Sequence, residues 1–251
     1  MREKSGDTKH DKHAQETSKR THLFTVTPQT GEMAYNKGNS LRKKEPKQER
    51  LGQMAEIRRK VAHLNDAREH GCLSCSVLNS TRIQVFSTIV SSLGNGLDIL
   101  DIGCGDGAIS KPVAKMGNHV TCLELPGVAN LARRCQVQTV VAGDAEQIPF
   151  TSDSFNMILA SEVIEHLWNP IDFLNEAHRA LKPEGCLIAE TPEGEEGLNY
   201  DSHKHYFTVE RLKQMVGEKF NVCEVKRLEA TGRAQTPTII MLLRKSASAK
   251  N

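Results

Sequence analysis

The sequence predicts an α/β fold, with a seven-stranded and mostly parallel sheet, helices on both faces and an antiparallel last strand. Three observations predict it. Seven short apolar runs follow one another between Leu97 and Leu243, helical patterns lie between most of them, and a glycine-rich turn directly follows the first run. Short, nearly continuous apolar strands that alternate with helices are typical of a parallel sheet covered on both faces.

The predicted strands are the apolar runs Leu97–Ile102, Val120–Leu123, Thr139–Ala142, Phe155–Ala160, Cys186–Glu190, Val222–Leu228 and Thr238–Leu243. The first five are separated by segments long enough for crossover connections, which parallel strands require. Only the loop Glu229–Thr236 separates the last two strands. This short connection favours a hairpin, so we expect the final strand to be antiparallel.

The chain is predicted to have four parts: a disordered basic tail (1–45), N-terminal helices that cover the site (46–96), an α/β domain (97–245) and a short disordered tail (246–251). Apolar residues at three- and four-residue steps from Leu51 to Leu64 predict the first of these helices. A similar pattern over Arg82–Leu93 predicts the second, and glycines end it.

Charge is unevenly distributed along the 251 residues, whose net charge is +2. Residues 1–60 carry 15 Lys and Arg against 8 Asp and Glu. Such a basic arm either contacts nucleic acid, an anionic membrane or an acidic protein, or is a solvated tail.

No secretory signal and no membrane-spanning run of about 20 apolar residues is evident. Seven cysteines, an odd number, fit reduced thiols, so we expect a cytoplasmic protein. The pair Cys72 and Cys75 is only half of a zinc site and is interpreted as part of a turn.

The first predicted strand ends in a glycine-rich turn, D-I-G-C-G-D-G. Glycines allow the backbone to turn sharply and to approach a ligand closely. Gly103, Gly105 and Ala108 also satisfy the dinucleotide pattern, with Glu124 about 20 residues further on. However, the Asp101 carboxylate before the first glycine would repel a pyrophosphate. It suits a ligand with a cationic amino group and no phosphate, as in S-adenosylmethionine.

The run Leu100–Gly107 resembles motif I of class I S-adenosylmethionine-dependent methyltransferases, and further matches follow in order to Leu243. In particular, the chain resembles the small-molecule O-methyltransferases of the methyltransferase type 11 and ubiquinone-pathway groups. The resemblance implies a Rossmann-like methyltransferase fold and S-adenosylmethionine as cofactor. It also implies that Glu124 holds the ribose hydroxyls and that the segment at Asp144 contacts adenine. The implied cofactor-binding residues are Asp101, Gly103, Cys104, Gly105, Glu124, Leu125, Asp144, Ala145 and Ser161.

An acid and histidine cluster follows the fourth strand. If this segment is helical, Glu162, Glu165 and His166 share one face, where they could bind a divalent cation or accept a proton. The same E-x-x-E-H spacing resembles ubiquinone-pathway O-methyltransferases, in which it supports a divalent metal. It also resembles small-RNA 3′-end 2′-O-methyltransferases, which add a later histidine; here His203 or His205 would supply it. A metal site, a metal-free base or orienting group, and a structural role all stay open.

The sequence therefore predicts an enzyme that transfers a methyl group to an oxygen, less favourably a nitrogen or carbon, of a small-molecule or biosynthetic acceptor. The candidate catalytic residues are Glu162, His166 and His205. Alternatives are an RNA or protein methyltransferase that uses the basic arm, and a catalytically silent cofactor-binding module that serves a partner. Trp168 lies beside the acid and histidine cluster. It either lines the substrate pocket or packs in the interior, and we favour packing.

Overall fold

The computed structural model describes residues 80–126, 129, 139–194, 203–230 and 236–247. The predicted tail 1–45, the predicted helix at Leu51–Leu64, and Cys72 with Cys75 lie outside the described residues, as does most of the predicted tail 246–251. Within the described part of the chain, no helix has the length and apolar character needed to cross a membrane.

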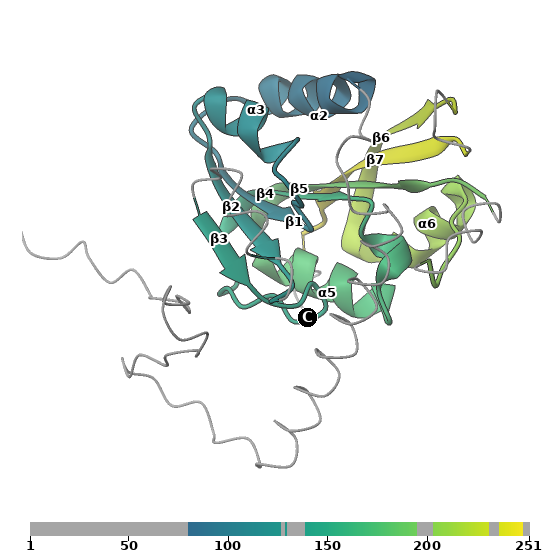
Figure 1. Ribbon diagram of the computed structural model, residues 1–251. Coiled ribbons are helices and arrows are strands. Elements are labelled where there is room, and N and C mark those ends of the chain that lie inside the picture. The colour runs from purple at the N-terminus through teal and green to yellow at the C-terminus, as the bar shows by residue number, and fades with distance from the viewer. Residues whose placement is uncertain (1–79, 127–128, 130–138, 195–202, 231–235, 248–251) are drawn as a thin grey trace, which may run out of the picture. The chain divides into compact units, whose positions relative to one another are not determined.

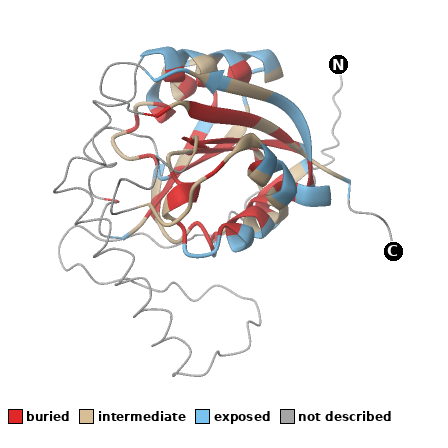
Figure 2. Ribbon diagram, turned by 90° about the vertical axis from the view of Figure 1, so that its right-hand side faces the viewer, coloured by how far each residue is buried: buried red, intermediate tan, exposed pale blue. Residues whose placement is uncertain are grey.

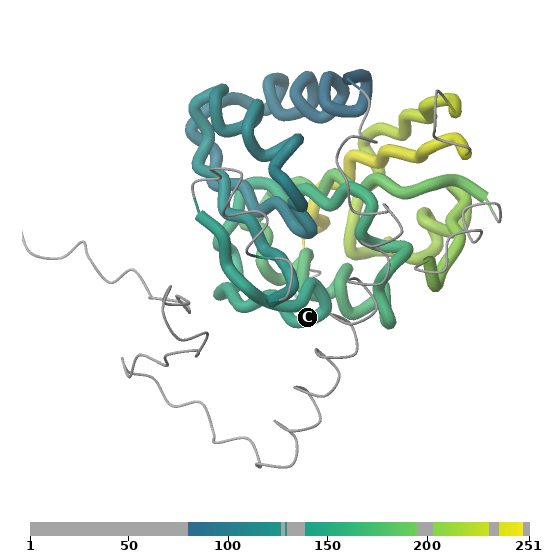
Figure 3. Tube along the Cα trace, in the orientation of Figure 1, coloured from purple at the N-terminus to yellow at the C-terminus, as the bar shows by residue number. Residues whose placement is uncertain are grey.

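One mixed sheet organises the described residues (Figure 1). Its strands are β1 (Asp98–Ile102), β2 (His119–Glu124), β3 (Thr139–Ala142), β4 (Phe155–Ser161), β5 (Leu181–Pro192), β6 (Phe220–Leu228) and β7 (Thr238–Lys245). The strand order is β3-β2-β1-β4-β5-β7-β6, and Figure 3 lets the reader follow the chain outward to β3 and back to β4. Strands β1 to β5 pair in parallel, whereas β7 is antiparallel to both β5 and β6. The predicted fold class is confirmed.

Strand β5 begins at Leu181, earlier than the predicted start at Cys186. Leu181 already pairs with Phe155 of β4, and the register then shifts before regular pairing resumes at Cys186. Glu184 lies within this irregular part, with a left-handed φ of 62°. Tertiary pairing therefore extends the strand through a segment whose residues are typical of a turn.

Helices cover both faces of the sheet (Figure 1). Helices α2 (Ser80–Leu93) and α3 (Ser110–Lys115) lie on one face, and α5 (Pro170–Ala180) and α6 (Val209–Val216) lie on the other. Helix α2 confirms the predicted helix at Arg82–Leu93. Figure 2 shows buried residues along the central strands and exposed residues on the outward sides of the helices.

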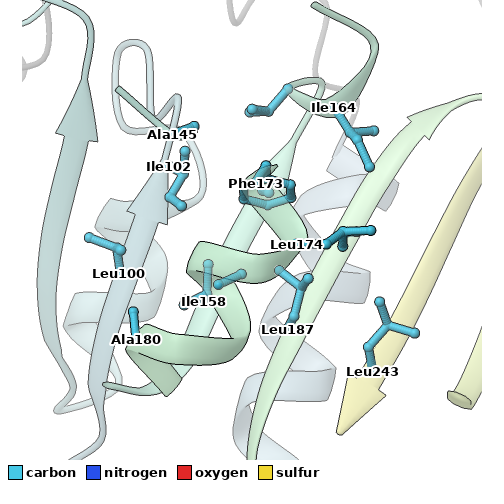
Figure 4. Packing of buried hydrophobic residues seen from close by; sticks show 14 of the residues in the cluster. Leu100, Ile102, Ala145, Ile158, Ile164, Phe173, Leu174, Ala180, Leu187 and Leu243 are labelled. Atoms are coloured by element: carbon cyan, nitrogen blue, oxygen red, sulfur yellow. The ribbon is translucent and has the colours of Figure 1, made fainter. Parts of the chain in front are cut away.

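The core has two parts, one on each face of the sheet. Neighbouring residues of β1 point to opposite faces, so Ile99 packs with α2 and α3, while Leu100 packs on the α5 side. On that side Phe173 and Leu174 of α5 lie over the central strands and are almost fully buried (Figure 4). Burial on both faces explains why the strands appear in the sequence as continuous apolar runs.

Side-chain caps fix the start of the two helices that follow β4 and β5. Asn169 caps α5 by accepting a hydrogen bond from the Ile171 N–H at 3.2 Å, and Pro170 occupies the first helical position. Thr208 caps α6 by accepting one from the Arg211 N–H at 3.2 Å. Both caps define where the preceding loops end.

The carboxyl ends of the parallel strands meet at one edge of the sheet. Ile102, the last residue of β1, is level with Leu123 of β2 and Ala160 of β4, and Ser161 at the end of β4 is level with Glu190 of β5. Loops that follow these strands therefore gather at the edge where open α/β sheets bind ligands.

Candidate functional site

The glycine turn after β1 has a backbone that favours glycine at three positions. Gly103, Gly105 and Gly107 have φ angles of 67°, 55° and 79°. A Cβ atom on Gly103 would also lie 2.6 Å from Cγ2 of Val163, in the loop after β4. The Gly103 N–H donates to Leu123 O at 2.9 Å, which ties the turn to β2. The turn is therefore packed closely between two neighbouring segments.

Asp101 lies near the end of β1, directly before the turn, and is only 2% exposed. Its carboxyl group accepts a hydrogen bond from the Ser110 hydroxyl of α3. Burial raises the pKa of Asp101 to about 7; the Ser110 hydrogen bond opposes this rise and the nearby Glu124 carboxylate adds to it. Near neutral pH this carboxyl group is thus only partly ionised, and a cation beside it would favour ionisation.

Glu124 ends β2 and is attached to the glycine turn. Its Oε2 atom accepts a hydrogen bond from the Gly105 N–H at 3.1 Å, and its Oε1 atom accepts one from the Leu125 N–H at 3.0 Å. Burial raises the pKa of Glu124, while these two hydrogen bonds lower it. Each carboxylate oxygen keeps a further lone pair. Glu124 therefore both holds the turn and retains acceptor capacity for a ligand.

The segment after β3 lies beside Glu124, because the Gly143 N–H donates to Glu124 O at 2.9 Å. Asp144 follows, and its Oδ1 atom accepts a hydrogen bond from the Glu146 N–H at 2.9 Å. Ala145 is 9% exposed. The fold thus brings the predicted residues Asp101, Glu124 and Asp144 to the ends of three adjacent strands.

Two further predicted cofactor-binding residues have their own partners in this structure. The Ser161 hydroxyl at the end of β4 donates to the Glu190 carboxylate, on the side of β4 away from β1. Cys104, within the turn, is 7% exposed and forms no disulfide, and its thiol donates to Gly105 O at 4.0 Å. Their role in cofactor binding stays a prediction.

The segment with the acid and histidine cluster is not α-helical, so the condition under which its three side chains would share one helical face is not met. Only the 3-10 helix η2 (Ile164–His166) forms, and the following residue, Leu167, is extended. Glu162 has a left-handed φ of 55°, and its N–H donates to Glu190 O at 3.0 Å. This bond continues the pairing of β4 with β5 past the end of the strand. Glu162 therefore does not lie at helical spacing from Glu165 and His166.

Glu165 and His166 are nevertheless close to a third ligand-type side chain, that of His203. One potential ligand atom from each residue lies within 4.8 Å of those of the other two. The His166 and His203 rings pack edge to face, with centroids 4.7 Å apart. The later histidine that the sequence allowed at two positions is thus His203 in this cluster, which we call the E-H-H group.

Glu165 is 1% exposed. Its Oε2 atom accepts a hydrogen bond from the Thr191 hydroxyl at 3.0 Å, and Oε1 lies 3.9 Å from His166 Nε2. The Glu165 carboxyl group also shares a side-chain hydrogen bond with Glu162. Burial and the neighbouring Glu162 carboxylate raise the pKa of Glu165 well above its ordinary value.

His205, the third candidate catalytic residue, lies against the loop after β4. Its Nε2 atom hydrogen-bonds with Leu167 O at 3.0 Å, and its N–H donates to Glu165 O at 3.3 Å. The adjacent Lys204 donates its N–H to the same oxygen at 2.8 Å and its Nζ to His166 O at 2.9 Å. The segment after β5 is thus fastened to the E-H-H group, and catalysis by His205 stays a prediction.

Sequence reasoning missed Arg82, on α2. Its guanidinium is buried at the same sheet edge, where Nη1 lies 3.0 Å from Glu162 Oε1 and Nε lies 3.1 Å from Glu190 Oε1. Its Nη2 atom donates to the Thr238 hydroxyl. The available signal was the position of Arg82 one turn before the buried Phe86, on the apolar side of the predicted helix.

Trp168 is 50% exposed, so the favoured expectation that it packs in the interior is wrong. The indole ring lies 4.6 Å from the Lys204 ammonium group, and the Trp168 backbone N–H donates to Glu146 Oε1 at 2.6 Å. The same carboxylate oxygen accepts the Asn169 N–H at 3.1 Å. Glu146 therefore links the segment after β3 to the loop that carries the E-H-H group and the exposed indole.

Comparisons with known proteins match the part of the chain that carries this site. Residues 100–189, from β1 to β5, match the family described as a methyltransferase domain. This part of the chain is therefore similar to a methyltransferase domain. The match includes Asp101, the glycine turn, Glu124 and the loop with Glu165 and His166, whereas Arg82 and His203 lie outside it.

Curated relatives match a part of the chain. The ubiquinone biosynthesis O-methyltransferase of Ruegeria pomeroyi is 35% identical over 102 residues, which is 38% of this chain and 41% of the relative. The enzyme of the same name from Agrobacterium fabrum is 38% identical over 103 residues, with the same two shares. The match thus spans about two fifths of the length of these relatives.

Solved structures resemble a larger part of the chain. The 1,6-didemethyltoxoflavin-N1-methyltransferase of Burkholderia thailandensis, with bound S-adenosylhomocysteine, has a TM-score of 0.61 at 18% identity and covers 78% of this chain and 90% of that one. The N-methyltransferase NodS of Bradyrhizobium japonicum, also a complex with S-adenosylhomocysteine, has a TM-score of 0.57 at 19% identity, with coverages of 66% and 87%. At such identities the likeness shows the fold, which is the Rossmann-like methyltransferase fold.

Proposed function

We propose that this protein is an S-adenosylmethionine-dependent methyltransferase that transfers a methyl group to an oxygen of a small-molecule acceptor. The observation that carries the proposal is the pair of carboxyl groups, Asp101 and Glu124, on either side of the glycine turn. They lie close enough for Glu124 to raise the pKa of Asp101. A dinucleotide would bring a pyrophosphate to this turn, where two carboxylates oppose it, whereas a ligand with an ammonium and a ribose diol suits both groups.

Oxygen is proposed as the acceptor atom on the basis of the relatives and of the E-H-H group. The relatives are named as O-methyltransferases. A hydroxyl acceptor must lose its proton as it attacks the methyl carbon, when the new O–C bond forms and the S–C bond breaks. Glu165 and His166 lie in the loop after β4, at the sheet edge where the donor would bind, and they can receive that proton. The rest of the site acts by orienting the two substrates and excluding water.

The E-H-H group also fits a divalent cation. One carboxylate and two imidazoles are a common ligand set for divalent transition metals, and one potential ligand atom from each of the three residues lies within 4.8 Å of those of the other two. A cation there would lower the pKa of a bound acceptor hydroxyl. In that case Glu165, His166 and His203 would be the protein ligands, and Glu162, which was part of the set expected from the sequence, would be paired with Arg82 instead.

Ligand binding tests the donor. Calorimetric titration of the full chain with S-adenosylhomocysteine and with NAD should give binding only to the former. Glu124→Gln and Asp101→Asn should each weaken it about 10-fold or more, in line with the loss of a charge-assisted hydrogen bond. Asp98→Asn is the matched control, because Asp98 lies at the opposite end of β1 and pairs with Lys182 at 2.8 Å. Binding of NAD alone would overturn the proposal.

Turnover tests the acceptor. S-adenosylhomocysteine production should be measured with a catechol, with primary and secondary amines and with short RNA, each with and without Mn²⁺. We expect turnover with the hydroxyl acceptor. Turnover with amines alone would replace oxygen by nitrogen as the acceptor atom, and turnover with RNA alone would favour the nucleic-acid alternative. Tight S-adenosylhomocysteine binding without turnover on any of them would favour a cofactor-binding module without catalytic activity.

A further inference from the structure

Behind the glycine turn, a row of buried polar side chains ends at the Asp101 carboxyl group. Asp101 and Cys122 are paired neighbours on β1 and β2, and Ser110 is the first residue of α3. Asp101 is 2% exposed, and Ser110 and Cys122 are fully buried. Buried polar groups find their hydrogen-bond partners within the protein, so the direction of each bond in this row can be worked out.

One hydroxyl hydrogen fixes the direction of the row. The Ser110 hydroxyl donates to Asp101 Oδ2. The Ser110 Oγ and Cys122 Sγ atoms lie 3.2 Å apart, within hydrogen-bond distance. A serine hydroxyl carries one hydrogen and two acceptor lone pairs, so a Ser110 that donates to Asp101 can only accept from Cys122. The Cys122 thiol is therefore the donor in this contact when Asp101 is ionised.

Cys104 extends the row into the glycine turn. Its thiol shares a hydrogen bond with Cys122, and this bond, together with burial, raises the pKa of Cys104. Because the Cys122 hydrogen points to Ser110, the Cys122 sulfur accepts in this bond and Cys104 donates. Gly105 O, 4.0 Å from Cys104 Sγ, faces the same thiol hydrogen. The donors of the row thus point in sequence toward Asp101.

A row with this direction favours the ionised form of Asp101. A donor to Ser110 Oγ polarises the hydroxyl and strengthens its bond to the carboxylate. A protonated Asp101 that donated to Ser110 would turn the serine hydrogen toward Cys122 Sγ, which is a weak acceptor. Burial and the Glu124 carboxylate act in the other direction and raise the pKa of Asp101 to about 7. Leu159, the neighbour of Asp101 on β4, adds no charge.

We propose that Cys122 is a positioning residue. By donating its thiol hydrogen to Ser110, it keeps the Ser110 hydroxyl directed at Asp101, so that a carboxylate faces the ammonium group of the methyl donor. The inference rests on the proposed function, because it names the residue that prepares Asp101 for that donor. Cys122 is fully buried, so it acts on the donor only through Ser110 and Asp101.

Titration of the Asp101 carboxyl group in the reduced, ligand-free full chain tests this inference without a donor. The aspartate carboxyl carbons are labelled with ¹³C, Asp101→Asn assigns the resonance of Asp101, and its chemical shift is followed from about pH 5 to 9. Cys122→Ala removes the thiol hydrogen and should raise the midpoint by about half a pH unit, since polarisation along the row is worth a fraction of one hydrogen bond. Ser110→Ala removes the bond to the carboxylate itself and should raise the midpoint by about one unit or more.

Two matched variants separate the hydrogen bond from packing. Cys122→Ser keeps a donor at the same position, so its midpoint should stay close to that of the wild type or lie below it. Cys186→Ala removes another buried thiol from the same part of the core and should leave the midpoint unchanged. If Cys122→Ala does not fold, infrared spectra of the wild type and Cys122→Ser decide. The S–H stretching band that is lost in Cys122→Ser should move to lower frequency in the wild type as Asp101 ionises.

Three results would overturn the inference. They are an unchanged midpoint in a folded Cys122→Ala protein, an equal rise in Cys122→Ser or Cys186→Ala, and a Cys122 S–H band that does not change as Asp101 titrates. Calorimetry with S-adenosylhomocysteine separates these results from a failure of the proposed function. If the wild type binds no S-adenosylhomocysteine while the ¹³C midpoints move as expected, the methyltransferase proposal fails and the hydrogen-bonded row does not. If the ligand binds and the ¹³C midpoint is the same in Cys122→Ala, only the role of Cys122 is refuted.

Discussion

Binding of the methyl donor, S-adenosylmethionine, and of its product S-adenosylhomocysteine should depend on pH through Asp101. Its carboxyl group is buried beside the glycine turn, its pKa is raised from 3.8 to about 7, and only its ionised form attracts an ammonium group. One pH unit below this pKa about a tenth of the protein is ionised, so the affinity for S-adenosylhomocysteine should fall about 10-fold for each pH unit below 7. This slope corresponds to about 1.4 kcal/mol of binding free energy per unit.

The sign of the effect on stability follows from the same shift. The folded-state pKa lies above that of an unfolded aspartate, so the free protein keeps a proton that the unfolded chain loses above pH 3.8. The contribution of this group to the free energy of unfolding is therefore fully present at acid pH and is lost as the pH rises toward 7. Stabilisation by the ligand should grow over the same range, because the ligand cation favours the carboxylate.

Calorimetry from pH 5.5 to 8.5 measures how the affinity for S-adenosylhomocysteine depends on pH. Two variants should move the midpoint of this dependence in opposite directions. Ser110→Ala removes a hydrogen bond that favours the carboxylate, so the midpoint should rise. Glu124→Gln removes a repelling charge, so the midpoint should fall while the overall affinity decreases. Asp101→Asn should bind weakly with a flat profile. A wild-type affinity that stays constant over this range, or midpoints that move the other way, would refute the reasoning.

Two further predictions concern the supports of the site. Gly94→Ala should lower the free energy of unfolding in urea by about 1 kcal/mol, and Gly103→Ala should lower it by more. Both positions have a positive φ, but only at Gly103 does the new methyl group also collide with a side chain. Equal losses would contradict the close packing of the turn. Glu146→Ala removes the acceptor of the Trp168 and Asn169 backbone N–H groups, so it should cost about 1–3 kcal/mol of unfolding free energy. It should also raise the mobility of Trp168, the only tryptophan, measured by fluorescence anisotropy. Glu176→Ala, which breaks a partly exposed ion pair on α5, is the control and should change both quantities little.

The sheet and the donor half of the site could be predicted from sequence because their signals are local. Each parallel strand is buried on both faces and therefore appears as a continuous apolar run. Asp101, Glu124 and Asp144 directly follow or end such runs, so the parallel arrangement alone brings them to one edge. The hairpin geometry of β6 and β7 likewise followed from the short loop between them.

The part of the site that we propose for the acceptor was determined by contacts between distant segments. The spacing of Glu162, Glu165 and His166 is compatible with a helix, but pairing of Ser161 with Glu190 and the Glu162 N–H bond to β5 prevent one. Local propensity is a weak preference that such tertiary hydrogen bonds override.

The partners of this half come from far along the chain. Arg82 reaches the acids from α2, and His203 reaches them from the segment after β5. The sequence pattern reveals neither contact, because periodicity shows which face of a helix or strand is buried but not which residues that face contacts. The sequence by itself thus determined the sheet and the donor-binding edge. Only the tertiary structure decided which acid is paired with Arg82 and which is left for the histidines.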